Sequence, residues 1–353
     1  MQLFKCQNCG QVLYFENTAC EKCGGRLGYL PDLGDMSVVD PDGSTWIARA
    51  NPTARYRFCA NWERNACNWL VSADDGEPYC RACQHNRTIP DISEPENYRN
   101  WQKIEEAKRR LFYSLIKLKL PIPTAASGDD EPLVFDFLAD PPDGGPRVMT
   151  GHDNGVITIA LTEADDATRE AARSSMGELY RTLLGHFRHE VGHYYWDKLV
   201  RDGNEIESFR TVFGDERADY GEALSRHYTH GAPPGWRNNF VSAYATMHPW
   251  EDWAETFAHY LHMVDTLEMA GAFGITIAPD IFDNPMLETP VRFDPHKVRH
   301  VEKLVEAWLP LTYAVNCVNR SMGQSDLYPF VIAPQVVEKL AYVHDMVHRP
   351  RAE

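Results

Sequence analysis

The chain has 353 residues, of which 43% are hydrophobic and 24% charged, a composition typical of a soluble globular protein. Its net charge of −16 lies almost entirely after residue 110: the first 110 residues hold 14 Lys and Arg against 15 Asp and Glu, and the rest hold 21 against 36. An acidic body repels phosphate backbones, which argues against nucleic-acid binding by the larger part of the chain. Because no basic segment with an apolar core opens the chain, and no uninterrupted apolar stretch approaches about 18 residues, we expect a cytoplasmic protein without a membrane partner.

Eight of the nine cysteines lie before residue 84, and only Cys317 follows. In a reducing compartment, paired Cys-x-x-Cys units indicate metal sites rather than disulfides. The first two units, Cys6 to Cys9 and Cys20 to Cys23, are each followed by glycine. Four thiolates form a closed tetrahedral shell, which favours a structural zinc ion.

A second and looser set of cysteines comprises Cys59, Cys67, Cys80 and Cys83. Only Cys80-Arg-Ala-Cys83 forms a tight turn, but an even number of cysteines in one short segment is what a metal site predicts. We expect these four thiolates to hold a second structural zinc ion. The alternatives are that some of these thiols are merely buried, or that His85 replaces one of them as a ligand.

Two polar segments suggest how the chain is divided. Residues 31–52 are rich in Asp, Gly and Pro, which predicts a linker or an irregular wrap, and residues 91–97 are polar and contain Pro95. We therefore expect a zinc ribbon over residues 1–35, a second four-cysteine module over residues 36–93 and a larger body over residues 94–353.

The body begins with a helix and a small sheet. Apolar spacing predicts a helix over residues 97–119, which Pro121 and Pro123 would stop. Residues 133–139 and 155–161 alternate well enough to predict strands. The second of these is our candidate for an edge strand that binds an extended peptide by strand addition, although an ordinary buried strand fits its sequence equally well.

Residues 183–199 contain His189-Glu190-Val191-Gly192-His193, the HExxH pattern of zinc peptidases. On a helix, His189 and His193 lie one turn apart on one face, so both imidazoles can bind one zinc ion. Glu190 would then lie beside the metal, where it could take a proton from a zinc-held water. The alternative is an amphipathic core helix with partly exposed histidines. A helix is predicted because apolar residues recur at spacings of three and four: Leu183, Leu184, Phe187, Val191, Tyr194 and Tyr195.

A catalytic zinc ion needs a third protein ligand and leaves its fourth position to water. Two acidic stretches after His193 supply candidates, and the second is favoured because Pro249 suits a first helical position and an apolar face follows it. Glu251 and Glu255 lie one turn apart, so one can bind zinc while the other orients a ligand histidine. Residues of the first stretch could instead orient His193, or be solvated. The candidates are Asp215, Glu216 and Asp219 in the first stretch and Glu251, Asp252 and Glu255 in the second.

Over nearly its whole length the chain resembles a bacterial family described as zinc-binding metallopeptidases with an N-terminal zinc-ribbon domain. The resemblance implies an α+β fold, with a mostly helical, zincin-like peptidase domain that contains a small sheet and follows two small four-cysteine zinc-ribbon modules. The residues that carry it are Cys6 to Cys9, Cys20 to Cys23, Arg57 to Trp62, Cys80 to Cys83, Arg87 to Pro90, Ala107 to Leu111, Tyr180 to Glu190 and His248 to Glu255.

A wider resemblance concerns the second acidic stretch. Glu251-Asp-Trp-Ala-Glu255-Thr-Phe257 is similar to the second metal helix of zincins whose third ligand is a glutamate, such as the lethal factor of anthrax toxin. This likeness implies that Glu251 is the third zinc ligand. It also implies that Glu255 does not bind zinc itself but contacts and orients a residue that does. It also implies that Tyr244, seven residues before Glu251, assists the oxyanion; the alternative for Tyr244 is a packed aromatic beside Phe240.

Together these observations predict a zinc-dependent peptidase with one catalytic and two structural zinc ions, acting on a peptide or protein substrate. Glu190 would serve first as general base and then as general acid. A second interpretation is an adaptor protein that binds partners through its zinc ribbons and uses a non-catalytic zincin body as a scaffold. The motivation for it is that the peptidase chemistry requires neither ribbon.

Overall fold

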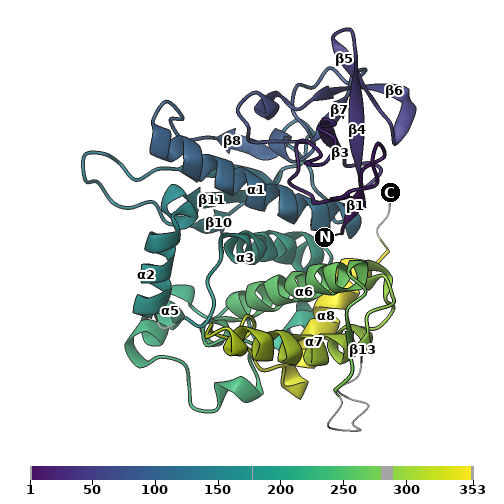
Figure 1. Ribbon diagram of the computed structural model, residues 1–353. Coiled ribbons are helices and arrows are strands. Elements are labelled where there is room, and N and C mark those ends of the chain that lie inside the picture. Colours follow the sequence, from purple (N-terminus) through teal and green to yellow (C-terminus); the bar gives the residue numbers. More distant parts are fainter. Residues whose placement is uncertain (1, 177, 280–288, 351–353) are drawn as a thin grey trace. The chain divides into compact units, whose positions relative to one another are not determined.

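The computed structural model describes residues 2–176, 178–279 and 289–350 (Figure 1). The chain divides into two compact units, residues 1–169 and 170–353. All but two of the described strands lie in the first unit and most helices lie in the second, so the predicted α+β class is confirmed. None of the helices in the described part combines the length and the apolar character that a membrane span requires.

The first unit opens with a short antiparallel hairpin of β1 (Phe4–Lys5) and β2 (Val12–Leu13). A five-stranded antiparallel sheet follows, in the order β3 (Leu27–Leu30), β4 (Asp35–Asp42), β5 (Thr45–Ala48), β6 (Asn51–Phe58) and β7 (Leu70–Ser72). The prediction of a linker over residues 31–52 is wrong, because this segment forms β4, β5 and the start of β6. Its Gly and Asp residues make hairpin turns, which use the same residue types as linkers. Strands of this sheet lie on both sides of the boundary expected between residues 35 and 36.

A second sheet in the same unit has the order β10 (Gly151–Asp153), β11 (Val156–Ala160), β9 (Val134–Leu138) and β8 (Asn86–Thr88). Strand β11 pairs with β10 on one side and with β9 on the other. The prediction that residues 155–161 form an edge strand is therefore wrong, and the alternative of a buried strand is correct. The pairing of β10 with β11 could not be predicted from the sequence, because β10 is a three-residue strand without an apolar pattern.

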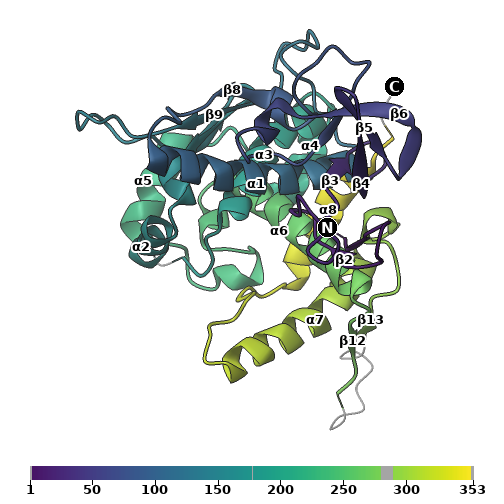
Figure 2. The same cartoon turned by 45° about the horizontal axis from the view of Figure 1, so that its top comes forward.

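Helix α1 (Pro95–Lys117) lies beside strands β8 and β9 of this second sheet (Figure 2). Phe112 of the helix contacts Phe135 of β9 edge to face, with ring centroids 6.0 Å apart. The helix begins and ends two residues earlier than predicted, and Lys119 follows it with φ +55°. An aromatic cluster of buried residues joins α1 to the cysteine-rich part of the unit; its members are Phe15, Tyr29, Trp69 and Tyr113.

The second unit consists mainly of helices, among which α6 is central. Its side chains Trp253, Phe257 and Leu261 are among those that are fully buried, and the helix packs against α3, α7 and α8. Figure 1 shows α3 and α6 side by side. The elements are α2 (Asp166–Met176, which begins in the first unit), α3 (Leu183–Tyr195), α4 (Ile206–Phe213), α5 (Tyr220–His230), α6 (Pro249–Ala272), the hairpin of β12 (Thr276–Ile277) and β13 (Thr289–Pro290), α7 (Glu302–Ser321) and α8 (Pro334–His348).

Helices α3 and α6 approach most closely at Gly192. A Cβ atom added there would lie 3.0 Å from the Cα and 3.2 Å from the carbonyl oxygen of Ala254. The indole of Trp253 donates a hydrogen bond of 2.8 Å to the carbonyl of Gly192. The glycine of the HExxH pattern thus allows the helix that carries the two histidines to lie directly against the helix that carries the acidic residues.

Candidate metal centres

The first four-cysteine cluster lies beside the β1–β2 hairpin. Its sulfur atoms are 3.7 Å apart for Cys6 and Cys23 and 3.6 Å apart for Cys9 and Cys20, and all four lie within 4.8 Å of one another. Four ligands of a tetrahedral zinc ion with Zn–S bonds of about 2.3 Å are separated by about 3.8 Å. The four thiols therefore fit a zinc ion.

The second cluster consists of Cys59, Cys67, Cys80 and Cys83, whose sulfur atoms also lie within 4.8 Å of one another. The sulfurs of Cys67 and Cys80 are 3.7 Å apart, and the backbone N–H of Cys80 donates to the sulfur of Cys59 at 3.4 Å. His85, the alternative ligand, is buried and places its Nδ1 2.6 Å from the carbonyl of Leu133. The four sulfurs again have the spacing of a tetrahedral zinc shell.

Helix α1 places buried cations beside this second cluster. Lys108 and Glu105, both completely buried, form an ion pair of 2.9 Å, and the Glu105 carboxylate lies 3.6 Å from the sulfur of Cys83. Arg109, also buried, donates to the carbonyl of Ala66. Burial lowers the pKa of Lys108, but Glu105 and Cys83 outweigh burial and raise it. Since zinc with four thiolates carries two negative charges, these cations offset the charge of a filled site.

A third group lies between α3 and α6. The Nε2 atoms of His189 and His193 are 3.2 Å apart, and the carboxylate oxygens of Glu251 lie 3.0 Å from His189 Nε2 and 3.4 Å from His193 Nε2. Ligands of a tetrahedral zinc ion at about 2.0–2.1 Å are separated by about 3.3–3.4 Å. Oε2 of Glu251 is buried and accepts no well-aligned hydrogen bond in the described part of the chain. This donor set therefore fits a zinc ion.

Both helices begin at capped residues, which fixes the direction of these side chains. Thr182 accepts a hydrogen bond of 3.0 Å from the backbone N–H of Gly185 at the start of α3. His248 caps α6 by accepting from the backbone N–H of Trp250, and Pro249 occupies the first turn as predicted. Glu251 consequently lies in the first turn of α6, where it is 2% exposed.

The electrostatics of this centre favour a cation. Glu255 Oε1 lies 2.7 Å from His189 Nδ1. Burial lowers the pKa of His189, but hydrogen bonds and charges from Glu251 and Glu255 outweigh burial and raise it well above its usual value. Burial raises the pKa of Glu251, while His193 and His189 bring it well below its usual range. With Nδ1 donating to Glu255, the Nε2 of His189 faces the other ligands, as expected of a metal-binding histidine.

Two further predicted residues lie close to this centre. Tyr244 stands in a short 3₁₀ turn, with its ring 6.0 Å from that of His189 and 5.8 Å from that of His227. Burial raises the pKa of Tyr244, so its hydroxyl stays protonated at neutral pH. Glu190, next to His189 on α3, is 9% exposed. Phe240, the alternative neighbour of Tyr244, contacts the ammonium group of Lys339 at 4.1 Å.

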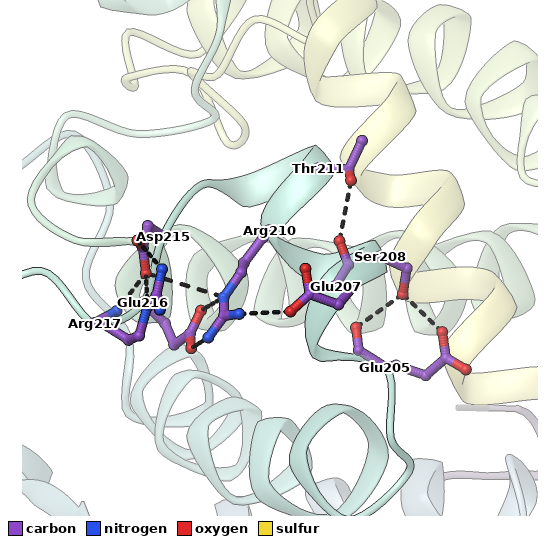
Figure 3. A network of polar contacts seen from close by, with 8 residues as sticks. All are labelled: Glu205, Glu207, Ser208, Arg210, Thr211, Asp215, Glu216 and Arg217. Carbon is purple, nitrogen blue, oxygen red and sulfur yellow. Dashed lines mark hydrogen bonds and ion pairs between the residues drawn. The ribbon is translucent and has the colours of Figure 1, made fainter.

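The other candidate carboxylates have partners elsewhere. Glu216 binds Arg210 at 2.5 Å and Asp215 binds Arg217 at 2.7 Å. Figure 3 shows both pairs. Asp219, predicted as a possible support for His193, caps α5 by accepting from the backbone N–H of Glu222 at 2.7 Å. Asp252 forms an ion pair of 2.6 Å with Lys339 of α8.

Tyr220 and His248 also lie at this centre, although no sequence pattern predicted a role for either residue. The hydroxyl of Tyr220 donates to Glu251 Oε1 at 2.9 Å. His248 Nε2 lies 3.0 Å from the carbonyl oxygen of Ala218, two residues before Tyr220. His248 is the capping residue of α6, three residues before Glu251, whereas no spacing rule links Tyr220 to Glu251, because only the fold brings the start of α5 to the start of α6. Tyr220 nevertheless ends the first acidic stretch in which Asp215, Glu216 and Asp219 had been considered.

Two four-cysteine clusters, together with a His-Glu-x-x-His helix that faces a glutamate on a second helix, give three groups of side chains that could each hold a metal ion. Residues 97–346 match the family described as "Putative zinc-binding metallo-peptidase", and residues 3–94 match a zinc-ribbon domain family. The chain belongs to this metallopeptidase family, as the sequence resemblance predicted.

Mycobacterial proteins are similar over almost the whole chain. Proteins named as uncharacterized from Mycobacterium tuberculosis (strain ATCC 25618 / H37Rv) and from Mycobacterium bovis are each 44% identical to it over 350 residues, which cover 98% of this chain and 95% of each relative. No solved structure matches the chain significantly.

Proposed function

We propose that this protein is a zinc-dependent peptidase whose catalytic zinc ion is held by His189, His193 and Glu251. The observation that carries the proposal is the convergence of these three side chains at the spacing of tetrahedral zinc ligands, with Glu190 adjacent on the same helix. The family description, which names a zinc-binding metallo-peptidase, supports the same reaction class.

When bound, a zinc ion would act as a Lewis acid that lowers the pKa of a water molecule and polarises a peptide carbonyl. Among the described residues, Glu190 forms no ion pair, so its carboxylate is available to take a proton from that water and to pass it to the leaving amine. Tyr244, kept protonated by burial, would donate a hydrogen bond to the developing oxyanion. Glu255 would hold His189 in the orientation that directs Nε2 to the metal.

We further propose that each four-cysteine cluster holds one structural zinc ion, which gives three zinc ions per chain. Unpaired thiols that bind metal persist in a reducing compartment, which supports a cytoplasmic location. The substrate would be a peptide or protein, and the zinc ribbons would be free to bind a protein partner. Elemental analysis should find three zinc ions in the wild type and two in the His189→Ala/His193→Ala variant; two in both would reject the catalytic centre.

The decisive experiment compares the zinc-loaded full chain with Glu190→Gln on denatured proteins and a peptide library, analysed by mass spectrometry. Loss of the general base should reduce cleavage about 10²–10⁴-fold. A matched control is Glu306→Gln, which removes an exposed carboxylate on α7 and should cleave like the wild type. If the wild type retains its third zinc ion but cuts nothing that Glu190→Gln leaves intact, the peptidase proposal fails and the zinc-ribbon adaptor becomes the better interpretation.

A further inference from the structure

The two carboxylate oxygens of Glu251 have different surroundings. Oε1 accepts a hydrogen bond of 2.9 Å from the hydroxyl of Tyr220. Oε2 lies 3.0 Å from His189 Nε2 and, although buried, accepts no well-aligned hydrogen bond from a described residue. A carboxylate can bind a metal ion through one oxygen or through both, and the second mode takes up more of the coordination sphere. The hydrogen-bond partner of Oε1 therefore affects how many coordination positions of the metal ion remain open.

We propose that Tyr220 is a positioning residue that engages Oε1 of Glu251, so that the carboxylate binds zinc through Oε2 alone and leaves one coordination position for water. Catalytic zinc sites combine three protein ligands with such an open position. Ligand carboxylates are commonly held by hydrogen bonds from residues behind them, and the loss of such a bond weakens the site. The inference rests on the proposed zinc site formed by His189, His193 and Glu251.

The loop before Tyr220 is fixed by ion pairs with α4. The chain leaves α4 at Gly214, whose φ of +101° favours glycine, and this residue lies next to Pro249 at the start of α6. Arg210 then binds the carboxylate of Glu216 through two nitrogens, at 2.5 and 2.9 Å (Figure 3). Because the Glu216 side chain is only 7% exposed, this two-point contact holds the middle of the loop in place.

His248 connects the same loop to α6. Its Nδ1 accepts from the backbone N–H of Trp250, and its Nε2 donates to the carbonyl of Ala218 at 3.0 Å. One imidazole therefore caps the helix that carries Glu251 and also holds the chain two residues before Tyr220. The ring of Tyr220 packs against those of His248 and Trp250, with centroids 5.4 and 6.3 Å away.

Asp219 fixes the start of α5, the helix that begins with Tyr220. As the capping residue of α5, it accepts a hydrogen bond from Glu222 N and makes Tyr220 the first residue of the helix. The acidic stretch before α5 thus contributes to the centre through the tyrosine that it positions. Contacts from α4, from the capping residue of α5 and from the capping residue of α6 hold the backbone before Tyr220 and the ring of Tyr220, so its hydroxyl has a fixed place beside Glu251.

The test is Tyr220→Phe in the full chain, which removes the hydroxyl and keeps the ring against His248. Since Tyr220 is 36% exposed, the fold should be retained, as two structural zinc ions and an unchanged circular dichroism spectrum would verify. The matched control is Tyr313→Phe on α7, a tyrosine that is 63% exposed. The metal of the third site is exchanged for Co²⁺ under mild chelation that leaves the four-cysteine sites filled, and zinc affinity is measured by chelator competition.

Zinc should bind the third site of Tyr220→Phe about 10–100-fold more weakly than that of the wild type. The visible Co²⁺ absorption should lose intensity, as expected when the metal gains a ligand atom, while Tyr313→Phe matches the wild type in both respects. An unchanged Co²⁺ spectrum in Tyr220→Phe overturns the proposal, whatever the zinc affinity.

These outcomes can be separated from a failure of the proposed function. A wild type that binds a third zinc ion but cleaves no peptide refutes the peptidase activity, and the Co²⁺ comparison still decides the role of Tyr220. An unchanged Co²⁺ spectrum in an active Tyr220→Phe enzyme overturns the role of Tyr220 alone. A wild type without a third zinc ion overturns both.

Discussion

The contact of α3 with α6 predicts that one added methyl group at Gly192 is costly. In Gly192→Ala, the new Cβ would lie 3.0 and 3.2 Å from backbone atoms of Ala254, which cannot rotate away. Overpacking of this kind costs about 1–3 kcal/mol. Alanine favours the helix over glycine by about 1 kcal/mol, which offsets part of that cost.

Gly221→Ala in α5 isolates the steric part of the effect. Gly221 is exposed, and the nearest atom to an added Cβ is Asp219 Oδ1 at 3.4 Å, an ordinary contact. Gly221 lies in the first turn of α5, where alanine gains less helix propensity than in the interior of α3, so the difference between the two stabilities is a lower bound on the cost of overpacking, about 1–3 kcal/mol. Scanning calorimetry of the zinc-loaded protein should show a Tm difference of about 2–4 °C per kcal/mol. Equal melting temperatures for Gly192→Ala and Gly221→Ala would refute the reasoning.

Two further predictions concern buried ionisable groups of the second unit. Lys339→Met leaves Asp252, 1% exposed, without its ion partner and should lower the free energy of unfolding by about 3–5 kcal/mol at pH 8. Burial raises the pKa of Asp252 to about 7, so protonation at pH 5 should reduce this loss; urea titrations that show equal losses at both pH values would contradict it. Burial lowers the pKa of His259 to about 4, so the unfolded chain binds more protons below the usual value of 6.5, and stability is lost as pH falls from 6.5 towards 4. His259→Gln should show a smaller fall in Tm over this window than the wild type, and an equal fall would exclude His259 as a cause.

Sequence patterns that depend on residues within one or two turns of each other predicted local structure correctly without knowledge of the tertiary fold. The four-cysteine sets were recognisable because ligand spacing within a Cys-x-x-Cys turn is short and local, and their sulfurs converge as two clusters. The pair His189 and His193 faces one way because the helix period alone places residues i and i+4 on one side. Pro249 at the start of α6 is a similarly local signal.

Errors arose where residue types serve two purposes. The Gly, Asp and Pro residues of 31–52 suit linkers and hairpin turns alike, and only strand pairing distinguishes the two. Strand β11 was expected at an edge, yet it is interior because the short strand β10 pairs with it.

The sequence alone determined the two cysteine clusters and the helix on which His189 and His193 face one side, because short-range geometry fixes both, while the α+β class followed from a family resemblance. It also narrowed the third ligand to two acidic stretches, and a family resemblance pointed to Glu251. Only the tertiary structure decided which side chains surround Glu251: Gly192 lets α3 and α6 meet, and the loop held by Arg210 brings Tyr220 to the carboxylate. Such contacts join residues far apart in the chain, so their partners depend on how helices pack rather than on any spacing along the sequence.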